Sequence, residues 1–377
     1  MRASEGFPGL LDGFREALDR ELAAWLTAKR DAARADGSAE MLDLIDGVGQ
    51  LVTQGGKRLR PALVYYTYRA CGGSSEAAAL PLALATELLH TYLLIHDDIM
   101  DHAEVRRGLP AAHVRFRDAH RARGLRGDGE DFGRSVAILL GDLAHTWAVE
   151  LATGLPVESA RAREVVRCFS AMCQEVIGGQ YLELVLAHRR RNPGEAPAPE
   201  QAEELLRVLR LKSGRYTAER PIQLGGLLAG APPAVLAALS GYGAAVGEAF
   251  QLQDDLLGMF GDAGTVGKPV VSDLKEGKFT FLIYHALAAA SPEQRQVLEA
   301  ALGDPDLDAG AAAAARRVIE ETGARATVTR MVADRLETAR AELAGLAETG
   351  GIEGGDLDPE ALLFFEGLID YLWERKQ

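Results

Sequence analysis

The chain has 377 residues, of which 47% are hydrophobic, and a formal net charge of −14. This acidic balance argues against a nucleic-acid partner, which needs a broad basic face, and the length allows a large core. The three cysteines, Cys71, Cys168 and Cys173, have an odd count and no metal-site spacing, so we expect a reducing compartment. Without a secretory pattern or an apolar run of membrane-spanning length, we expect a cytoplasmic protein with no membrane span.

Most of the chain is predicted to be helical, because Ala and Leu dominate many windows and β-branched alternation is scarce. Apolar spacing predicts helices over residues 7–34, 41–52, 135–151, 161–187 and 201–229, the last kinked or broken at Pro221. We expect Pro81 to open another helix, and the chain from residue 281 onward to be Ala/Leu-rich helix with turns. A long surface loop with a short helix is expected near residues 108–133, and an exposed loop near residues 188–200.

One predicted helix ends in an acidic stretch. Its apolar run leads into Asp97, Asp98 and Asp101, and Arg106 and Arg107 follow. In a helix, Asp97 and Asp101 stand at i and i+4 with Cβ atoms about 5–6 Å apart, and two such carboxylates repel unless a cation lies between them. Oxygen ligands suit Mg²⁺, which is usually held by one or two carboxylates together with substrate phosphates. The arginines are a residue type that binds such phosphates.

Two further stretches complete this pattern. GGKRLRP, residues 55–61, combines two glycines, three cations and a helix-starting proline, which favours an anion site, with a solvated turn as the alternative. FQLQDD, residues 250–255, is a second apolar helix end with an Asp-Asp pair, and a loop with Gly and Lys follows it. A lone acidic motif in an acidic chain is weak evidence for a metal. Together, the two motifs predict facing carboxylate clusters that share Mg²⁺ on one diphosphate, above an apolar pocket for a hydrocarbon tail.

These motifs give the chain a specific resemblance. In order, GGKRLRP, DDIMD at 97–101, Gly141-Asp142, GGQ at 178–180, Lys212-Ser213, FQLQDD and two later Gly-Lys pairs resemble the trans-isoprenyl diphosphate synthases of the polyprenyl synthetase family. The resemblance spans residues 55–278 and implies an all-α, isoprenoid synthase type helical bundle around a central active-site cavity, as a single domain over residues 1–377. It also implies a homodimer, with Mg²⁺ as the cofactor and three ions in each active site.

Residue roles are implied by the same resemblance. The catalytic and metal-binding aspartates would be Asp97, Asp98, Asp101, Asp254 and Asp255. The allylic diphosphate would be bound by Arg106, Lys212, Gln251, Lys268 and Lys278, with Lys212 also counted as catalytic. Isopentenyl diphosphate would be bound by Lys57, Arg60, His90 and Arg107; without the resemblance, His90 is better read as a core histidine. Two positions depart from the family pattern: Gly258 stands where a third aspartate is common, with Asp262 as a partial substitute, and Ser213 replaces a threonine.

The implied reaction is a head-to-tail condensation. The allylic substrate loses pyrophosphate, the double bond of isopentenyl diphosphate attacks the resulting cation, and the pyrophosphate takes the released proton. In the family, the residues four and five before the first aspartate face the growing chain, and here they are Leu93 and Tyr92. A single ring at the fifth position resembles synthases that stop at geranylgeranyl diphosphate, C20; the alternative is that Tyr92 is a core residue. Other readings are a farnesyl or longer-chain synthase, a class I terpene cyclase and a non-catalytic partner subunit.

Overall fold

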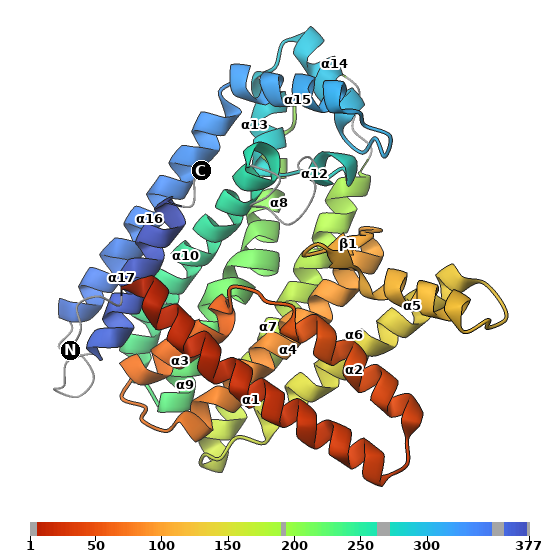
Figure 1. The fold of residues 1–377 in the computed structure, drawn as a ribbon. Helices are drawn as coiled ribbons and strands as arrows, with labels where there is room; N and C mark the ends of the chain where they lie inside the picture. Colours follow the sequence, from red (N-terminus) through yellow and green to blue (C-terminus); the bar gives the residue numbers. More distant parts are fainter. Residues whose placement is uncertain (1–5, 190–193, 262–271, 349–357, 375–377) are drawn as a thin grey trace. The chain divides into compact units, whose positions relative to one another are not determined.

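The computed structural model describes residues 6–189, 194–261, 272–348 and 358–374, and these are almost entirely helical (Figure 1). The predicted all-α fold is confirmed, because the one sheet among the described residues is a hairpin of two short antiparallel strands. The chain divides into two compact units: unit 1 with Met1–Arg167, Leu224–Ala231 and Asp358–Phe364, and unit 2 with Cys168–Gln223, Pro232–Leu357 and Phe365–Gln377. The single domain expected from the sequence stays a prediction.

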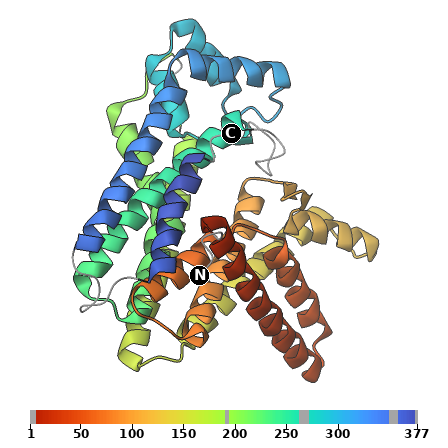
Figure 2. The same ribbon diagram turned by 60° about the vertical axis from the view of Figure 1, so that its left-hand side comes forward.

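Unit 1 contains the first acidic motif. Its elements are α1 (Phe7–Ala35), α2 (Ala39–Thr53), α3 (Leu59–Ala70), α4 (Glu76–Met100), β1 (Val105–Arg106), β2 (Leu109–Pro110), α5 (Ala112–Ala122) and α6 (Gly129–Thr153). Three helices have residues in both units: α7 (Ser159–His188), α9 (Arg220–Ala229) and α17 (Pro359–Glu374). α1 and α2 lie side by side in both views (Figures 1 and 2). α1 buries Phe14, Leu18, Leu22 and Leu26 on one face, as its predicted period requires.

The helix of the first acidic motif begins earlier than predicted. α4 starts at Glu76, so Pro81 lies inside the helix and does not open it. The residues between them include three alanines, and alanine has the highest helix propensity, which explains why the helix extends upstream of the proline. Leu84 and Leu88 are fully buried, so α4 runs through the core of unit 1.

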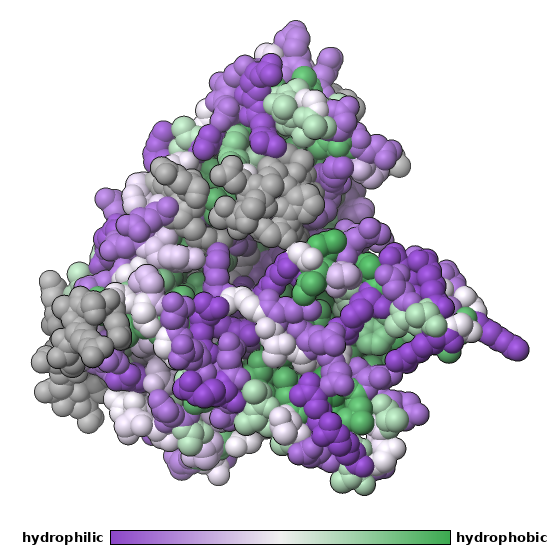
Figure 3. Space-filling model, viewed as in Figure 1, coloured by the Kyte–Doolittle hydropathy of each residue, from purple (hydrophilic) through white to green (hydrophobic). Residues whose placement is uncertain are grey.

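The region near residues 108–133 contains more regular structure than the surface loop with a short helix that was expected. The β1–β2 hairpin, α5 and the start of α6 occupy most of it. Asp128 caps α6, because its side chain accepts a hydrogen bond from the backbone N–H of Glu130. Figure 3 shows apolar side chains at the hairpin, where Val105 and Leu109 are 48% and 46% exposed. The hairpin directly follows the acidic motif and therefore positions the two arginines after it.

α6, which contains the helix predicted over residues 135–151, is not buried on all sides. It packs against α4 and α5, while Ile138, Leu139 and Val149 are 45%, 54% and 37% exposed. By length and composition both α4 and α6 could cross a membrane, so the expectation that no apolar run reaches that length is wrong. Buried core helices pass the same test, and the most apolar windows of α4 and α6 are 67% and 44% buried. The absence of a membrane span stays a prediction.

Unit 2 contains the second acidic motif. Its elements are α8 (Pro199–Val208), η1 (Leu209–Glu219), α10 (Pro233–Phe260), α12 (Ser272–Lys275), α13 (Phe281–Ala289), α14 (Pro292–Ala301), α15 (Ala309–Glu321) and α16 (Ala324–Glu348). α10 and α16 lie side by side in both views (Figures 1 and 2). The helix predicted over residues 201–229 consists of α8, the π-helix η1 and α9. Pro221 is the second residue of α9, so the π-helical turns end just before a residue that cannot donate a backbone hydrogen bond.

Candidate active site

The end of α4 keeps Asp97 and Asp101 on one face, as predicted. Asp97 and Asp98 lie in the last turn, and Asp101 follows the helix as its C-cap residue. The backbone N–H of Asp101 donates to the carbonyl oxygen of Asp97 at 2.8 Å, so the turn between them stays helical. Asp98 is buried, whereas Asp97 and Asp101 are partly exposed. The motif therefore combines one buried carboxylate with two that solvent reaches.

Arg106 on β1 balances the charge of two of these carboxylates. Its Nε donates to Asp98 Oδ1 at 2.8 Å, its Nη2 contacts the same oxygen, and that Nη2 lies 3.4 Å from Asp97 Oδ2. Burial would lower the pKa of Arg106, but the hydrogen bond to Asp98 and the aspartate charges outweigh burial and raise it. This arginine therefore supplies part of the positive charge that the sequence analysis assigned to a bound cation.

Arg107 has a different neighbour from Arg106. Its φ of 53° is left-handed, and its Nη1 donates to the carbonyl oxygen of Gly55 at 2.6 Å. Gly56 has a φ of 121°, and a Cβ there would lie 3.0 Å from Arg107 Nη2. Gly55 is thus needed for its positive φ, and Gly56 is needed both for its positive φ and for the space that it leaves for Arg107. The stretch presents Lys57, which is exposed, next to this arginine.

His90 lies on α4 among the cations of unit 1. Burial lowers its pKa well below the ordinary value, and the charges of Arg60, Arg107, Arg106 and Arg58 lower it further. The imidazole is therefore neutral at pH 7 and offers hydrogen bonds without a charge. Unit 1 brings Arg60, His90 and Arg107 together, as the family resemblance implied for isopentenyl diphosphate; their binding role stays a prediction.

The second acidic motif lies near the end of α10 in unit 2. Ser213 Oγ donates to Gln251 Oε1 at 2.6 Å, and Gln251 Nε2 donates to Asp255 Oδ1 at 2.7 Å. Burial raises the pKa of Asp255 well above its ordinary value, and the charge of Asp273 raises it further, although the hydrogen bond from Gln251 lowers it. A bound cation would reverse this shift and hold Asp255 ionised. The hydroxyl of Ser213, which stands where the family pattern has threonine, is therefore part of this chain of hydrogen bonds.

Lys212 lies in η1 and forms an ion pair with Glu183 of α7. The close approach of the two helices requires Gly179, because a Cβ there would lie 2.5 Å from the backbone nitrogen of Lys212. The second glycine of the GGQ stretch, Gly179, thus has a packing role, because it leaves space for the backbone of η1. Glu183 was not predicted as part of the site; its position four residues after that glycine, on the same helical face, was the available signal.

The residues present fit a hard divalent cation. The motifs offer carboxylate oxygens, the ligands that Mg²⁺ prefers, and the burial of Asp255, which the hydrogen bond from Gln251 offsets only in part, would be relieved by a cation. Within the described ranges, no three His, Cys, Asp or Glu side chains gather closely enough to hold a metal ion by themselves. An ion here would therefore need oxygens from a ligand and from water as well. Lys268 and Asp262 lie outside the described residues.

Tyr92 and Leu93 are half-buried on α4, one turn before the aspartates. The Tyr92 ring lies 4.8 Å from the ring of His96 and 5.0 Å from the ring of His145 on α6. Gly141, the glycine of the Gly-Asp pair, leaves the space for His96, since a Cβ there would collide with the imidazole. The rings thus form a cluster between α4 and α6.

Comparisons with known proteins agree with this arrangement. The polyprenyl synthetase family model matches residues 43–319, which is most of the chain. The chain belongs to the polyprenyl synthetase family. The short chain isoprenyl diphosphate synthase of Methanocaldococcus jannaschii is 35% identical over 257 residues, 68% of this chain and 70% of its own. The geranylgeranyl diphosphate synthase of Methanosarcina mazei is 37% identical over 236 residues, 63% of this chain and 65% of its own.

A solved structure extends the similarity to nearly the whole fold of this polyprenyl synthetase. The geranylgeranyl pyrophosphate synthase from Corynebacterium glutamicum, complexed with isoprenyl diphosphate and magnesium, has a TM-score of 0.87 at 32% identity. The match covers 97% of this chain and 99% of that one. The isoprenoid synthase type fold is thereby confirmed, and this polyprenyl synthetase is a trans-prenyltransferase, as the sequence predicted.

The departure at Gly258 has a structural counterpart in this polyprenyl synthetase. A Cβ at Gly258 would lie 3.0 Å from Asp273 Oδ2, so the carboxylate of Asp273 lies where a side chain at position 258 would project. Lys278 pairs with Glu276 and lies 3.7 Å from Asp273 Oδ1. Asp273 was missed by the sequence analysis, although it stands in the SDLKEGK stretch that leads to Lys278. Its charge raises the pKa of Asp255, so a carboxylate from outside the motif lies near Asp255. Asp262, expected as a partial substitute, lies outside the described residues.

Proposed function

We propose that this polyprenyl synthetase condenses isopentenyl diphosphate with an allylic diphosphate and releases geranylgeranyl diphosphate. The observation that carries the proposal is that two adjacent arginines contact different groups. Arg106 contacts Asp97 and Asp98, while Arg107 contacts the Gly55 carbonyl beside Lys57. Two neighbouring places for an anion, one with carboxylates and one without, suit two different diphosphates. A terpene cyclase needs only the first.

The proposed cofactor is Mg²⁺, with three ions in each active site, and similarity to the synthase complexed with magnesium supports it. Asp97, Asp98 and Asp101 at the end of α4, and Asp254 and Asp255 on α10, would hold the ions; Asp273 adds a carboxylate. When bound, the ions neutralise charge on the departing pyrophosphate. That both acidic motifs serve one allylic diphosphate is part of this proposal and comes from the family resemblance.

The residues of the chain contribute binding, orientation and exclusion of water. Lys212 and Arg106 would bind the allylic diphosphate, with Gln251, Lys268 and Lys278, and would stabilise the charge that grows on its bridging oxygen as the C–O bond breaks. Arg107, Arg60, Lys57 and neutral His90 would hold isopentenyl diphosphate so that its double bond attacks C1 of the allylic cation. A new C–C bond forms and moves the positive charge onto the former isopentenyl unit. A proton leaves the carbon next to that charge, a double bond forms there, and the pyrophosphate accepts the proton.

Product length is proposed to depend on Tyr92 and Leu93. The Tyr92 ring is backed by His96 and by His145, so it is less free to turn aside than an isolated ring. A side chain held in this way would stop a growing hydrocarbon tail at a fixed length. Similarity to geranylgeranyl diphosphate synthases supports C20.

We further propose a homodimer and a cytoplasmic location. The exposed face of α6 carries Ile138, Leu139 and Val149, and an apolar helix face of this kind is typical of a subunit contact. Leu139→Asp should shift the enzyme from dimer to monomer in light-scattering measurements on size-exclusion fractions. Fractionation of expressing cells would test the location, with the enzyme expected in the fraction without membranes.

One assay tests the proposed activity. The purified enzyme is incubated with Mg²⁺, isopentenyl diphosphate and, separately, the C5, C10 or C15 allylic diphosphate, and the products are dephosphorylated and separated by chromatography. A C20 alcohol as the end product supports the proposal. A C15 or longer alcohol indicates a different chain length, a cyclic hydrocarbon indicates a cyclase, and no product from any starter indicates a non-catalytic partner.

A further inference from the structure

The lysine of the Lys-Ser pair stands in a segment with an unusual backbone. η1 is a π-helix of 11 residues that contains Lys212 and Ser213, whereas π-helical turns normally occur one at a time and often at functional sites. The π-helix is wider than the α-helix, and its hydrogen bonds skip one more residue. If the segment relaxed to α-helix, every side chain along it would rotate relative to its neighbours. The direction of Lys212 therefore depends on whatever keeps this segment π-helical.

Glycines make room for the wider segment on two sides. On α7, a Cβ at Gly179 would lie 2.5 Å from the backbone nitrogen of Lys212. On α10, a Cβ at Gly247 would collide with the carbonyl oxygen of Gly214, which is also in η1. These glycines permit the π-helix but do not hold it, because they make no directional bond to it.

Side-chain ion pairs hold both ends of η1. Near its start, Arg210 Nε lies 3.0 Å from Glu248 Oε1, and the other oxygen of that buried glutamate lies 2.5 Å from Arg335 Nε of α16. Near its end, Arg215 Nη1 donates to Glu175 Oε1 at 2.8 Å. Two glutamates, one from α10 and one from α7, thus fix the segment that carries Lys212.

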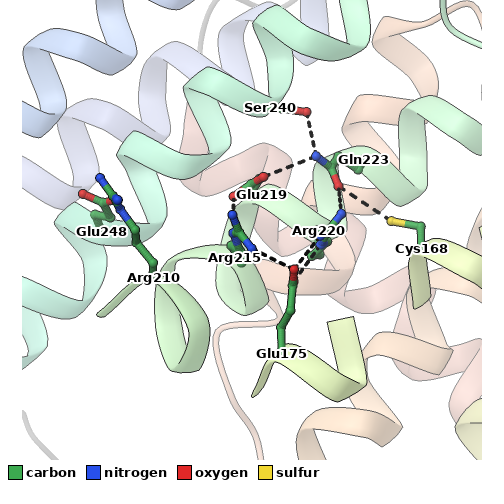
Figure 4. Close-up of polar contacts among 9 residues, drawn as sticks. All are labelled: Cys168, Glu175, Arg210, Arg215, Glu219, Arg220, Gln223, Ser240 and Glu248. Carbon is green, nitrogen blue, oxygen red and sulfur yellow. Dashed lines mark hydrogen bonds and ion pairs between the residues drawn. The ribbon is translucent and has the colours of Figure 1, made fainter. Parts of the chain in front are cut away.

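The contacts at the end of η1 are the more extensive ones (Figure 4). Glu175 also accepts hydrogen bonds from Arg220, at 2.8 Å from Nε and 2.6 Å from Nη2. Arg220 in turn donates to Gln223, and Gln223 donates to Ser240 of α10 at 3.0 Å. Burial would raise the pKa of Glu175, but the hydrogen bonds and charges of the two arginines lower it, so the carboxylate is ionised.

We propose that Glu175 is a positioning residue for the allylic diphosphate: by holding Arg215 and Arg220 it keeps η1 π-helical and thereby directs Lys212. Glu175 does not itself touch the substrate. The inference rests on the proposed function, in which Lys212 binds that diphosphate. It predicts that loss of Glu175 weakens binding of the allylic diphosphate alone, and that this loss has no further effect once Lys212 has been removed.

The test uses Glu175→Gln, which keeps the size of the side chain and removes its charge. We expect the KM for the allylic diphosphate to rise about tenfold or more, because small misplacements of a binding group have effects of this size. The KM for isopentenyl diphosphate should change less than about twofold. In the Lys212→Ala background, adding Glu175→Gln should change the allylic KM less than about twofold, since the group it positions is gone.

Asp358→Asn serves as the matched control. Asp358 and Glu175 have 19% and 18% of their side chains exposed, and each is paired with arginine, but Asp358 contacts Arg69 in unit 1. This variant should lower the midpoint of unfolding comparably without changing the allylic KM. If Glu175→Gln is not recovered folded, Arg215→Gln replaces it, because the carboxylate then keeps its pair with Arg220, and the same change in the allylic KM is expected.

The outcomes separate this inference from the proposed function. If the wild-type enzyme makes no prenyl diphosphate, the proposed function fails and the inference with it. If Lys212→Ala leaves the allylic KM unchanged, the role of Lys212 is wrong. If Lys212→Ala raises that KM while Glu175→Gln does not, or if the two effects multiply in the double variant, Glu175 does not act through Lys212 and the inference is overturned.

Discussion

Arg58 of the GGKRLRP stretch forms a buried ion pair with Glu87 of α4. Both residues are almost fully buried, at 3% and 4% exposed, and Arg58 Nη2 also donates to the carbonyl oxygen of Val52 at 2.6 Å. Arg58 has a left-handed φ of 52°, which directs its side chain inward while Lys57 stays exposed. One cation of the stretch thus serves the fold, whereas Lys57 lies at the surface.

Arg58→Leu should destabilise the enzyme by about 3–5 kcal/mol, because the glutamate is left charged and unpaired in the core. Urea unfolding followed by circular dichroism measures this free energy. The control is Arg34→Leu, which breaks the exposed pair with Asp31 and should cost less than about 1 kcal/mol. Equal losses in the two variants would show that burial of the Arg58–Glu87 pair does not matter.

The sequence shows three cations in GGKRLRP, but it does not show which of them is buried and which is exposed. Lys57, Arg58 and Arg60 are equivalent as cations in the sequence; only the left-handed backbone at position 58 distinguishes the inward one, and no pattern of residue types encodes it. By contrast, the helix over residues 7–34 was predictable because its apolar residues repeat with the helical period. Local, periodic signals were sufficient for helices.

Features that depend on contacts between distant parts of the chain were not predictable. Gly258 indicated a missing carboxylate, but Asp273 lies beside it only because the chain returns to α10 fifteen residues later, and the sequence does not specify that return. The π-helix around Lys212 has the composition of an α-helix, and both the room for it, left by Gly179 and Gly247, and the ion pairs along it come from other helices. The motifs of the candidate site could thus be found in the sequence, whereas the side chains and glycines that support their geometry could not.

Tyr92→Ala should let products grow beyond C20. Removing the ring takes away the side chain that His96 and His145 hold in place, and a longer tail can then occupy the space. Chromatography of the dephosphorylated alcohols measures the product lengths. Tyr181→Ala, which removes a ring that is 70% exposed on α7, should leave them unchanged. An unaltered C20 product from the Tyr92 variant would mean that this ring is only a core residue.

Mg²⁺ should bind tightly only together with a diphosphate. No group of three potential ligands is preformed in the described part of the chain, so water and carboxylates alone would hold the ion weakly. Titration calorimetry with an unreactive allylic thiodiphosphate should show at least about tenfold tighter Mg²⁺ binding than without it.

Asp97→Ala and Asp254→Ala should abolish this gain in Mg²⁺ affinity and lower turnover by at least about 100-fold without unfolding the enzyme. The exposed Asp334→Asn is the control, and a gain that survives both substitutions contradicts the proposed metal ligands.

His90 should make the enzyme less stable as the pH falls below about 6.5. Its pKa in the folded chain is lowered by burial and by the charges of Arg60, Arg107, Arg106 and Arg58, so below that pH the unfolded chain binds a proton that the folded chain does not. Stability that is fully present at pH 7 is then lost with decreasing pH, by up to about 1.4 kcal/mol per pH unit. Urea unfolding between pH 7 and 5.5 measures this slope, which His90→Asn should reduce. The exposed His188→Asn should leave it unchanged, and equal slopes in wild type and His90→Asn would mean that His90 is not held neutral among those arginines.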